Sequence, residues 1–181
     1  VMDETIVIIT SDHGEQFNEH DKWLHYELYN EVTHVPLIIY VPNNNQGKRV
    51  SQYTESIDIA PTILDLIDIN SSKFEKQAEG KSLVPLMKGK DIEKEYILSE
   101  IDDLVSLIDT KNNLKYYKEP PRNIAALYNL EEDFKEMKNL NSTNKIENMK
   151  EKLRKIRSNL NKDKNRTENV KERLRDLGYI N

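Results

Sequence analysis

The fold of this chain is indicated first by the stretch Thr5-Ile6-Val7-Ile8-Ile9-Thr10-Ser11-Asp12-His13-Gly14-Glu15. It begins as a short, unbroken, β-branched run, which is typical of a strand that is buried on both faces of a parallel sheet. Such strands belong to α/β folds, and ligands bind in the crevice beyond their carboxyl ends. Asp12 and His13 therefore lie where a metal site or a catalytic site is expected.

The segments that follow continue the α/β pattern. A second buried strand is predicted at residues 35–41, where Pro36 is tolerable because it lies near the strand start. Residues 26–32, after a polar loop, fit a short helix. A longer helix is predicted after Asp58, which suits the N-cap, with Pro61 in the first turn. Residues 80–86 indicate a turn and a short surface helix.

The second half of the chain has a different pattern. Four short strands are predicted at residues 96–99, 104–109, 114–117 and 125–130, with a hairpin signal at Asn112-Asn113. Residues 144–177 are helical in pattern and highly charged, with a narrow apolar stripe at Ile146, Met149, Leu153, Ile156 and Leu160. We therefore predict part of an α/β domain at 1–92, a small antiparallel subdomain at 93–140 and a charged helical tail at 141–181.

Composition excludes several classes of function. The 181 residues carry a net charge of −5, which argues against a general nucleic-acid binder. The absence of cysteine excludes disulfides, thiolate metal sites and a cysteine nucleophile within the chain. No apolar run approaches the roughly 18 residues of a membrane span. Because a buried parallel strand needs a neighbour on each side, we expect this to be the C-terminal part of a larger protein, with the missing N-terminal part as its partner.

All four histidines lie between positions 13 and 34, around the predicted site. Asp12 and His13 combine a carboxylate with an imidazole, a mixture that suits zinc, manganese or iron better than an all-oxygen cage, although calcium is not excluded. Two ligands are too few for a complete site, so others must come from elsewhere. His20 and His25 lie in the same loop, close enough to face the metal or an anionic substrate.

Other polar residues near the loop have more ordinary interpretations. Glu15 is interpreted as a group that orders the loop rather than as a ligand. Lys22 can neutralise an anionic substrate, and a solvated loop lysine is the alternative. His34, just before the second strand, is assigned a structural role. Asp58 and Thr62 are interpreted as helix-capping residues.

An ordered set of motifs connects these segments to a known family. After the stretch at 5–15 come Glu19-His20, His25, Leu28-Tyr29-Asn30-Glu31-Val32, His34-Val35-Pro36-Leu37-Ile38-Ile39, Ser56-Ile57-Asp58-Ile59-Ala60-Pro61-Thr62, Gly80-Lys81-Ser82-Leu83 and Leu127-Tyr128-Asn129-Leu130. The set resembles the C-terminal half of a sulfatase of the alkaline phosphatase superfamily. The likeness spans positions 3–140 and the last few residues. It implies an α/β alkaline-phosphatase-like sandwich with a small antiparallel sheet.

The resemblance also implies a chemistry. Family members bind one divalent cation through a pair matched here by Asp12 and His13; calcium is the family's usual ion, and zinc or manganese are alternatives. The other ligands, and a formylglycine nucleophile made from a Cys/Ser-x-Pro-x-Arg motif, lie upstream in relatives and have no match in this chain. His25 matches a position that contacts the substrate or acts as general acid. Lys22 would contact the substrate, while His20 and Glu15 would support the site.

The substrate implied is a sulfate ester, either a small molecule or a glycan, and nothing implies nucleic acid. Relatives often place glycines where this chain has Asn18, Asp21, Leu24 and Tyr26. Asn and Asp tolerate positive φ, so their replacement is mild, whereas Leu24 and Tyr26 leave the placement of His25 open.

Two other functions are compatible with the sequence. The first is a phosphoethanolamine or phosphoglycerol transferase, or another phosphoester-processing member of the same superfamily, which would share the motif at 11–15. The second is a non-catalytic remnant or interaction module whose charged tail engages a partner. In every case we expect the isolated 181-residue chain to be inactive, because the nucleophile and half of the metal ligands are absent from it.

Overall fold

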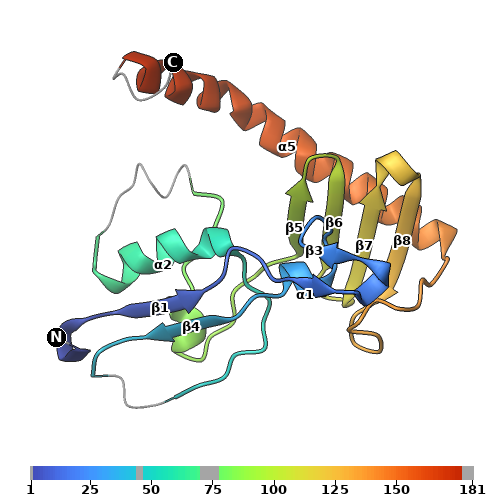
Figure 1. The fold of residues 1–181 in the computed structure, drawn as a ribbon. Helices are drawn as coiled ribbons and strands as arrows, with labels where there is room; N and C mark the ends of the chain where they lie inside the picture. The colour runs from blue at the N-terminus through green and yellow to red at the C-terminus, as the bar shows by residue number, and fades with distance from the viewer. Residues whose placement is uncertain (1, 44–46, 70–77, 177–181) are drawn as a thin grey trace. The chain divides into compact units, whose positions relative to one another are not determined.

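The computed structural model describes residues 2–43, 47–69 and 78–176. The chain forms two compact units, Val1–Leu140 and Asn141–Asn181, and each is described by itself. The second unit contains the helix α5 (Thr143–Asp176), as the pattern at 144–177 predicted (Figure 1). The resemblance of the last few residues to the family extends past residue 176 and so lies partly outside the described residues. Among those residues, no helix is long and apolar enough to cross a membrane.

The two predicted apolar strands are present and pair with each other. After the short turn η1 (Met2–Glu4), strand β1 (Val7–Thr10) runs antiparallel to β4 (Leu37–Tyr40), with Ile8 opposite Ile39 (Figure 1). The strand predictions are therefore confirmed, but the expected parallel pairing is not what these two strands form. The chain doubles back between them through a loop and a short helix, which returns β4 in the opposite direction.

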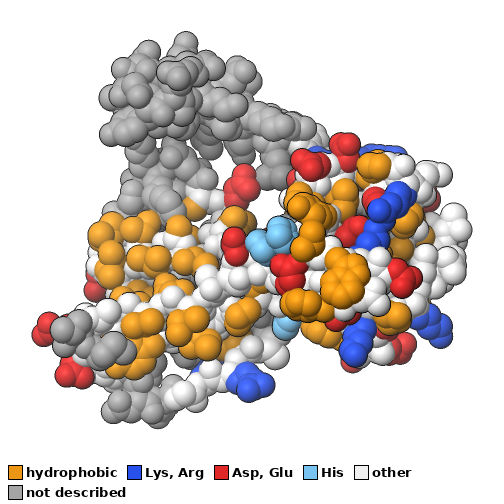
Figure 2. Space-filling model, in the orientation of Figure 1, with side chains coloured by type: hydrophobic (Ala, Val, Ile, Leu, Met, Phe, Trp, Pro, Cys, Tyr) orange, Lys and Arg blue, Asp and Glu red, His pale blue; other side chains and the backbone are white. Residues whose placement is uncertain are grey.

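The expectation that β1 is buried on both faces is wrong for the described chain. Ile9 is 54% exposed and its partner across the ladder, Ile38, is 57% exposed. The opposite face of β4 is covered, because Leu37 and Ile39 pack against the buried cluster of Leu83, Leu86 and Ile92. Figure 2 shows hydrophobic side chains gathered over this part of the molecule. Because side chains of a strand alternate between faces, helix packing on one side leaves the other side open.

The loop after β1 forms a small hairpin. Strands β2 (Gln16–Phe17) and β3 (Trp23–Leu24) pair antiparallel around the turn η2 (Glu19–Asp21). The next helix, α1 (Asn30–Thr33), is shorter than the predicted 26–32. Its N-cap, Tyr29, is extended, and Leu28 and Tyr29 are buried in a core cluster with Tyr117, Ala126, Tyr128 and Leu130. Packing of these side chains thus replaces the first helical turn.

Helix α2 (Ile59–Leu66) follows the turn η3 (Ser56–Asp58), and α4 (Val84–Met87) follows the Gly80 turn. The sequence predicted that Asp58 caps α2; it is the residue before α2, but its side chain makes no cap hydrogen bond to that helix and instead forms a capping box with Glu55 at the start of η3. The Asp58 carboxylate accepts hydrogen bonds from the backbone N–H groups of Glu55 and Lys81, at 2.8 Å each, and pairs with Lys94. The carboxylate is fully buried, so it binds these three segments together.

The predicted antiparallel sheet is confirmed as four strands in sequence order, namely β5 (Tyr96–Ile101), β6 (Leu104–Asp109), β7 (Leu114–Glu119) and β8 (Ile124–Asn129). The turn η4 (Pro120–Arg122) joins β7 to β8, and Asn113 between β6 and β7 has a φ of 50°, as a tight Asn turn requires. Core residues Tyr117 and Leu127 are fully buried. The proposed domain boundary near residue 92 stays a prediction.

Candidate active site

The polar turn after β1 is fixed to α1 by its backbone. Gly14 N–H donates to Val32 O at 2.8 Å, and Ser11 Oγ donates to His13 O at 2.6 Å. A Cβ on Gly14 would lie 2.0 Å from Glu31 O, so only glycine allows this approach of the two backbones. The turn therefore presents the neighbouring side chains of Asp12 and His13 from a defined position.

Asp12 and His13 lie close together, as expected. Asp12 Oδ2 is 3.7 Å from His13 Nε2, and the two side chains are 87% and 41% exposed. His13 Nδ1 is 2.8 Å from Gly14 O, a carbonyl that only accepts, so this nitrogen carries the hydrogen and Nε2 keeps its lone pair. The His13 backbone N–H donates to Asp12 Oδ1, which holds the pKa of the Asp12 carboxyl below its ordinary value.

These two residues fit part of a cation site. Ligand atoms on a divalent cation with bonds of about 2.0–2.5 Å lie roughly 3–4 Å apart. The separation of 3.7 Å between Asp12 Oδ2 and His13 Nε2 agrees with that range. The carboxylate is held in its charged form and the imidazole offers a lone pair, so both donors have the electronic state that a metal requires.

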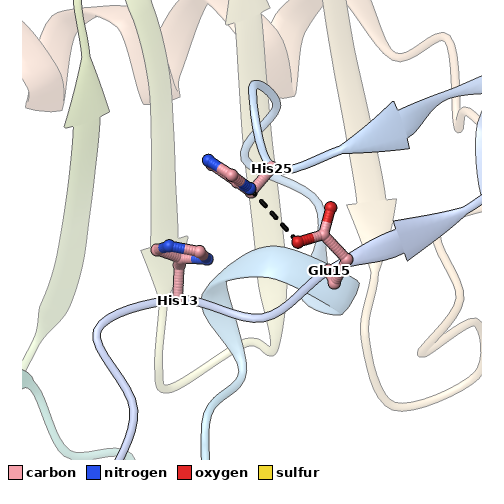
Figure 3. Close-up of side chains that lie close together, drawn as sticks. All are labelled: His13, Glu15 and His25. Carbon is pink, nitrogen blue, oxygen red and sulfur yellow. Dashed lines mark hydrogen bonds and ion pairs between the residues drawn. The ribbon is translucent and has the colours of Figure 1, made fainter.

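His25 and Glu15 lie beside His13 (Figure 3). The rings of His13 and His25 are stacked, with centroids 4.1 Å apart and planes inclined by 25°. His25 Nδ1 is 3.2 Å from Glu15 Oε2. The structure therefore brings four of the six predicted site residues together at the end of β1: Asp12, His13, Glu15 and His25.

The three side chains His13, Glu15 and His25 could together be considered for one metal ion, because their potential ligand atoms lie within 4.8 Å of one another. The stacking argues against this arrangement. An ion bound by imidazole lies close to the ring plane, about 2.0–2.1 Å from the nitrogen. Two nearly parallel, stacked planes do not meet within that distance. His13 is thus better paired with Asp12 as a ligand, with His25 beside it.

Lys22 is engaged elsewhere. Its Nζ lies 2.5 Å from Oε1 of Glu27, whose side chain is 8% exposed. Glu27 also accepts a hydrogen bond from the Tyr117 hydroxyl and lies 3.5 Å from Arg122. The charge of Lys22 is therefore compensated by a buried carboxylate, and its predicted contact with an anionic substrate stays a prediction.

The His20 ring does not lie with the stacked rings of His13 and His25. It stacks on Tyr29 with centroids 3.8 Å apart and planes inclined by 7°, and its Nε2 is 3.7 Å from Glu31 Oε2. Tyr29 stacks in turn on Tyr117 of β7. This arrangement connects the hairpin loop to the sheet, which is compatible with a supporting role. His34 packs edge-on against Phe134, far along the chain.

The loop has an unusual backbone. Asn18, Asp21 and Leu24 have φ values of 85°, 55° and 71°, and His20 lies at 55°. The left-handed region is where glycine would be preferred, and Asn and Asp tolerate it better than leucine does. Leu24 therefore adopts the costly conformation directly before His25, while Tyr26 is not among the residues with positive φ.

A buried ion pair near the site was not anticipated from the sequence. Lys115 Nζ lies 2.9 Å from Glu136 Oε1 and 3.0 Å from Asn30 Oδ1, and both charged side chains are fully buried. Glu136 Oε2 also accepts from the Asn30 backbone N–H at 2.6 Å, at the start of α1. Burial lowers the pKa of Lys115 and raises the pKa of Glu136, because it disfavours each charged form. No local sequence signal connects these residues.

Comparisons with known proteins show what this chain is similar to. The family model described as Sulfatase matches residues 1–69. Arylsulfatase K of Homo sapiens is 31% identical over 155 residues, which cover 77% of this chain and 28% of that protein. Choline-sulfatase of Rhizobium meliloti (strain 1021) is 30% identical over 89 residues, covering 49% of this chain and 17% of the relative.

A solved structure extends the likeness to the fold. A 2-O GAG sulfatase superposes with a TM-score of 0.65 and 26% sequence identity over 93% of this chain and 38% of that one. The chain thus spans 28% of the human relative and 38% of the solved structure.

Proposed function

We propose, on the premise that this chain belongs to the sulfatase family of the alkaline phosphatase superfamily, that it supplies half of the active site of a sulfuric ester hydrolase. The observation that carries the proposal is the convergence of Asp12, His13 and His25 at the end of β1. The similarity to sulfatases, together with the motif order after the sheet, favours this function over the phosphoethanolamine or phosphoglycerol transferases.

Asp12 and His13 hold the divalent cation in this proposal. Calcium is the ion that the family favours, and zinc and manganese are alternatives that the imidazole donor accommodates. When bound, the cation stabilises the negative charge on the sulfuryl oxygens. A formylglycine outside these 181 residues is the nucleophile that we propose.

His25 is the catalytic residue of this chain in the proposal. When the bond between sulfur and the ester oxygen breaks, the electron pair passes to the leaving oxygen, which then needs a proton. Protonated His25 gives that proton from its ring nitrogen and the alcohol leaves. The stack on His13 holds the ring beside the metal ligands, and Glu15 and His20 support the loop. Lys22, which is paired with Glu27, stays a proposed substrate contact at the edge of the loop.

The substrate in this proposal is a sulfate ester of a small molecule or a glycan. Two of the relatives are named for such compounds, one for choline sulfate and one for a 2-O sulfated GAG. Both kinds of ester present the same sulfuryl group to the metal and His25, so the residues at the end of β1 serve either. The organic part of the ester is recognised elsewhere.

A metal titration tests the proposal on a complete sulfatase polypeptide that carries this segment and the remaining ligands. Isothermal titration with Ca²⁺, Zn²⁺ and Mn²⁺ should detect binding to its unsubstituted form. Asp12→Ala and His13→Ala should each weaken it by more than about tenfold, because each removes a ligand. His34→Ala, whose ring packs on Phe134, is the matched control and should bind as the wild type does. Equal binding by all three variants would overturn the assignment.

An activity assay adds a second test. The purified 181-residue chain should not turn over an aryl sulfate, because no residue of it matches the Cys/Ser-x-Pro-x-Arg motif. Within a complete sulfatase polypeptide that carries this segment, Asp12→Ala or His13→Ala should abolish turnover. Turnover by the isolated chain would show that the nucleophile has been placed wrongly.

A further inference from the structure

Glu15 has one described partner at the candidate site, and that partner is His25. Its Oε2 lies 3.2 Å from His25 Nδ1, whereas its Oε1 is buried and has no hydrogen-bond partner among the described residues. A buried oxygen without a partner is costly, so such a group calls for an explanation.

We infer that Glu15 is a positioning residue that fixes the tautomer and the orientation of His25; this inference rests on the proposed function. An ionised carboxylate has no hydrogen to donate, so Nδ1 of His25 must carry the hydrogen that they share. The lone pair of neutral His25 is then on Nε2, at the far side of the ring from Glu15. Nε2 is thereby the atom at which His25 exchanges a proton with substrate.

The stack on His13 completes the arrangement. The Glu15 contact stops rotation about the bond to the ring, and the face of His13, 4.1 Å away, restricts tilting of His25 (Figure 3). His13 has the same tautomer, because its Nδ1 faces the Gly14 carbonyl. The two rings thus leave Nε2 available for different tasks: His13 Nε2 lies 3.7 Å from Asp12 Oδ2, and His25 Nε2 would meet the ester of the proposed function. A hydrogen-bond partner of this kind commonly decides which ring nitrogen is available.

The test is a measurement of the imidazole tautomers by two-bond ¹H–¹⁵N correlation NMR on the ¹⁵N-labelled chain, at a pH where the rings are neutral and without metal. The wild type should show His25 as the Nδ1–H form. Glu15→Ala should shift His25 to a majority of the Nε2–H form, while His13 keeps its Nδ1–H form through Gly14. Glu15→Gln retains an acceptor oxygen and should restore much of the Nδ1–H population.

Glu19→Ala is the matched control, because Glu19 belongs to the same loop but its carboxylate accepts from the Phe17 backbone. It should leave the His25 tautomer unchanged. A wild-type His25 in the Nε2–H form, or a tautomer unaffected by Glu15→Ala, would overturn the inference. The readout is independent of the proposed function: if the chain shows the tautomer but a complete polypeptide that carries this segment binds no divalent ion, the Glu15–His25 pair stands and the metal assignment fails.

Discussion

Two groups of charged residues in this chain have opposite surroundings. Asp12, at the end of β1, is 87% exposed, and His25 and Glu15 beside it are about one-third exposed, at 37% and 35%. Lys115 and Glu136, by contrast, are fully buried and paired with each other and with the start of α1. The exposed group is open to ligands, whereas the buried group is paired with charged and polar partners within the protein.

Both groups contain left-handed backbone. The loop at 18–24 has four residues with positive φ, one of them a leucine, and Glu136 of the buried pair has a φ of 55°. Strain that persists in a folded chain is supported by the structure around it. Burial is what separates the two groups, so we expect changes in the buried group to affect stability most and changes in the exposed group to affect binding.

The largest expected effect is the removal of one partner of the buried pair. Lys115→Met leaves the Glu136 carboxylate buried without its cation and should lower the free energy of unfolding by about 3–5 kcal/mol. The double variant Lys115→Met/Glu136→Gln removes both charges and keeps an acceptor for the Asn30 N–H, so it should recover most of the loss. Urea denaturation followed by circular dichroism measures both.

The matched control for the comparison is Asp12→Asn, because it neutralises an exposed carboxylate in the other group. It should change the free energy of unfolding by no more than about 0.5 kcal/mol. If Lys115→Met were equally mild, the distinction between a stabilising group and a binding group would fail.

The next effect is expected at Gly14, where the turn after β1 contacts the backbone of α1. Gly14→Ala places a methyl group against Glu31 O, so the turn must move away from α1. We expect a loss of about 1–3 kcal/mol in the free energy of unfolding, typical of overpacking, together with weaker metal binding. Gly47→Ala, with nothing within 4 Å of the added atom, is the control and should be neutral. Unchanged melting of the Gly14 variant would contradict the close backbone contact.

The smallest expected effect is a gain. Leu24→Gly removes a left-handed conformation that costs a side chain about 1–2 kcal/mol, less about 0.5–1 kcal/mol of added unfolded-state entropy. The net result should be a stabilisation of about 0.5–1 kcal/mol, visible as a higher melting temperature. Tyr26→Gly, at a similarly exposed residue without positive φ, should be destabilising instead. A loss of stability for both variants would show that the leucine is not strained.

Much of the fold follows from local pattern. The apolar run at 5–10, the strands of the antiparallel sheet and the helix beginning near residue 143 were all predicted, because hydrophobic periodicity reports the local backbone conformation. The strand-end position also indicated Asp12 and His13 correctly as close neighbours. Asp12 and His13 are adjacent in the sequence, so no tertiary contact is needed to bring them together.

Other features depend on contacts between distant residues. Lys115 meets Asn30 across 85 positions, and Glu136 meets Asn30 across 106. Asp58 was expected to cap its own helix; it forms a capping box with Glu55 just before that helix and also binds the distant Lys81 and Lys94. Lys22 pairs with a buried glutamate beside Tyr117. A charged side chain takes the partner that the packed chain brings within reach, and the sequence does not state which partner that is.

The sequence by itself thus determined the order of strands and helices and the location of the candidate metal ligands, because both arise from residues close together along the chain. The tertiary structure alone decided the antiparallel partner of β1, the stacking of His25 on His13, the contact between Glu15 and His25, and the buried pair beside α1. Those features depend on which side chains the fold packs together. A buried charge has no solvent to stabilise it and needs a partner, and a tightly packed position has no room for an additional atom.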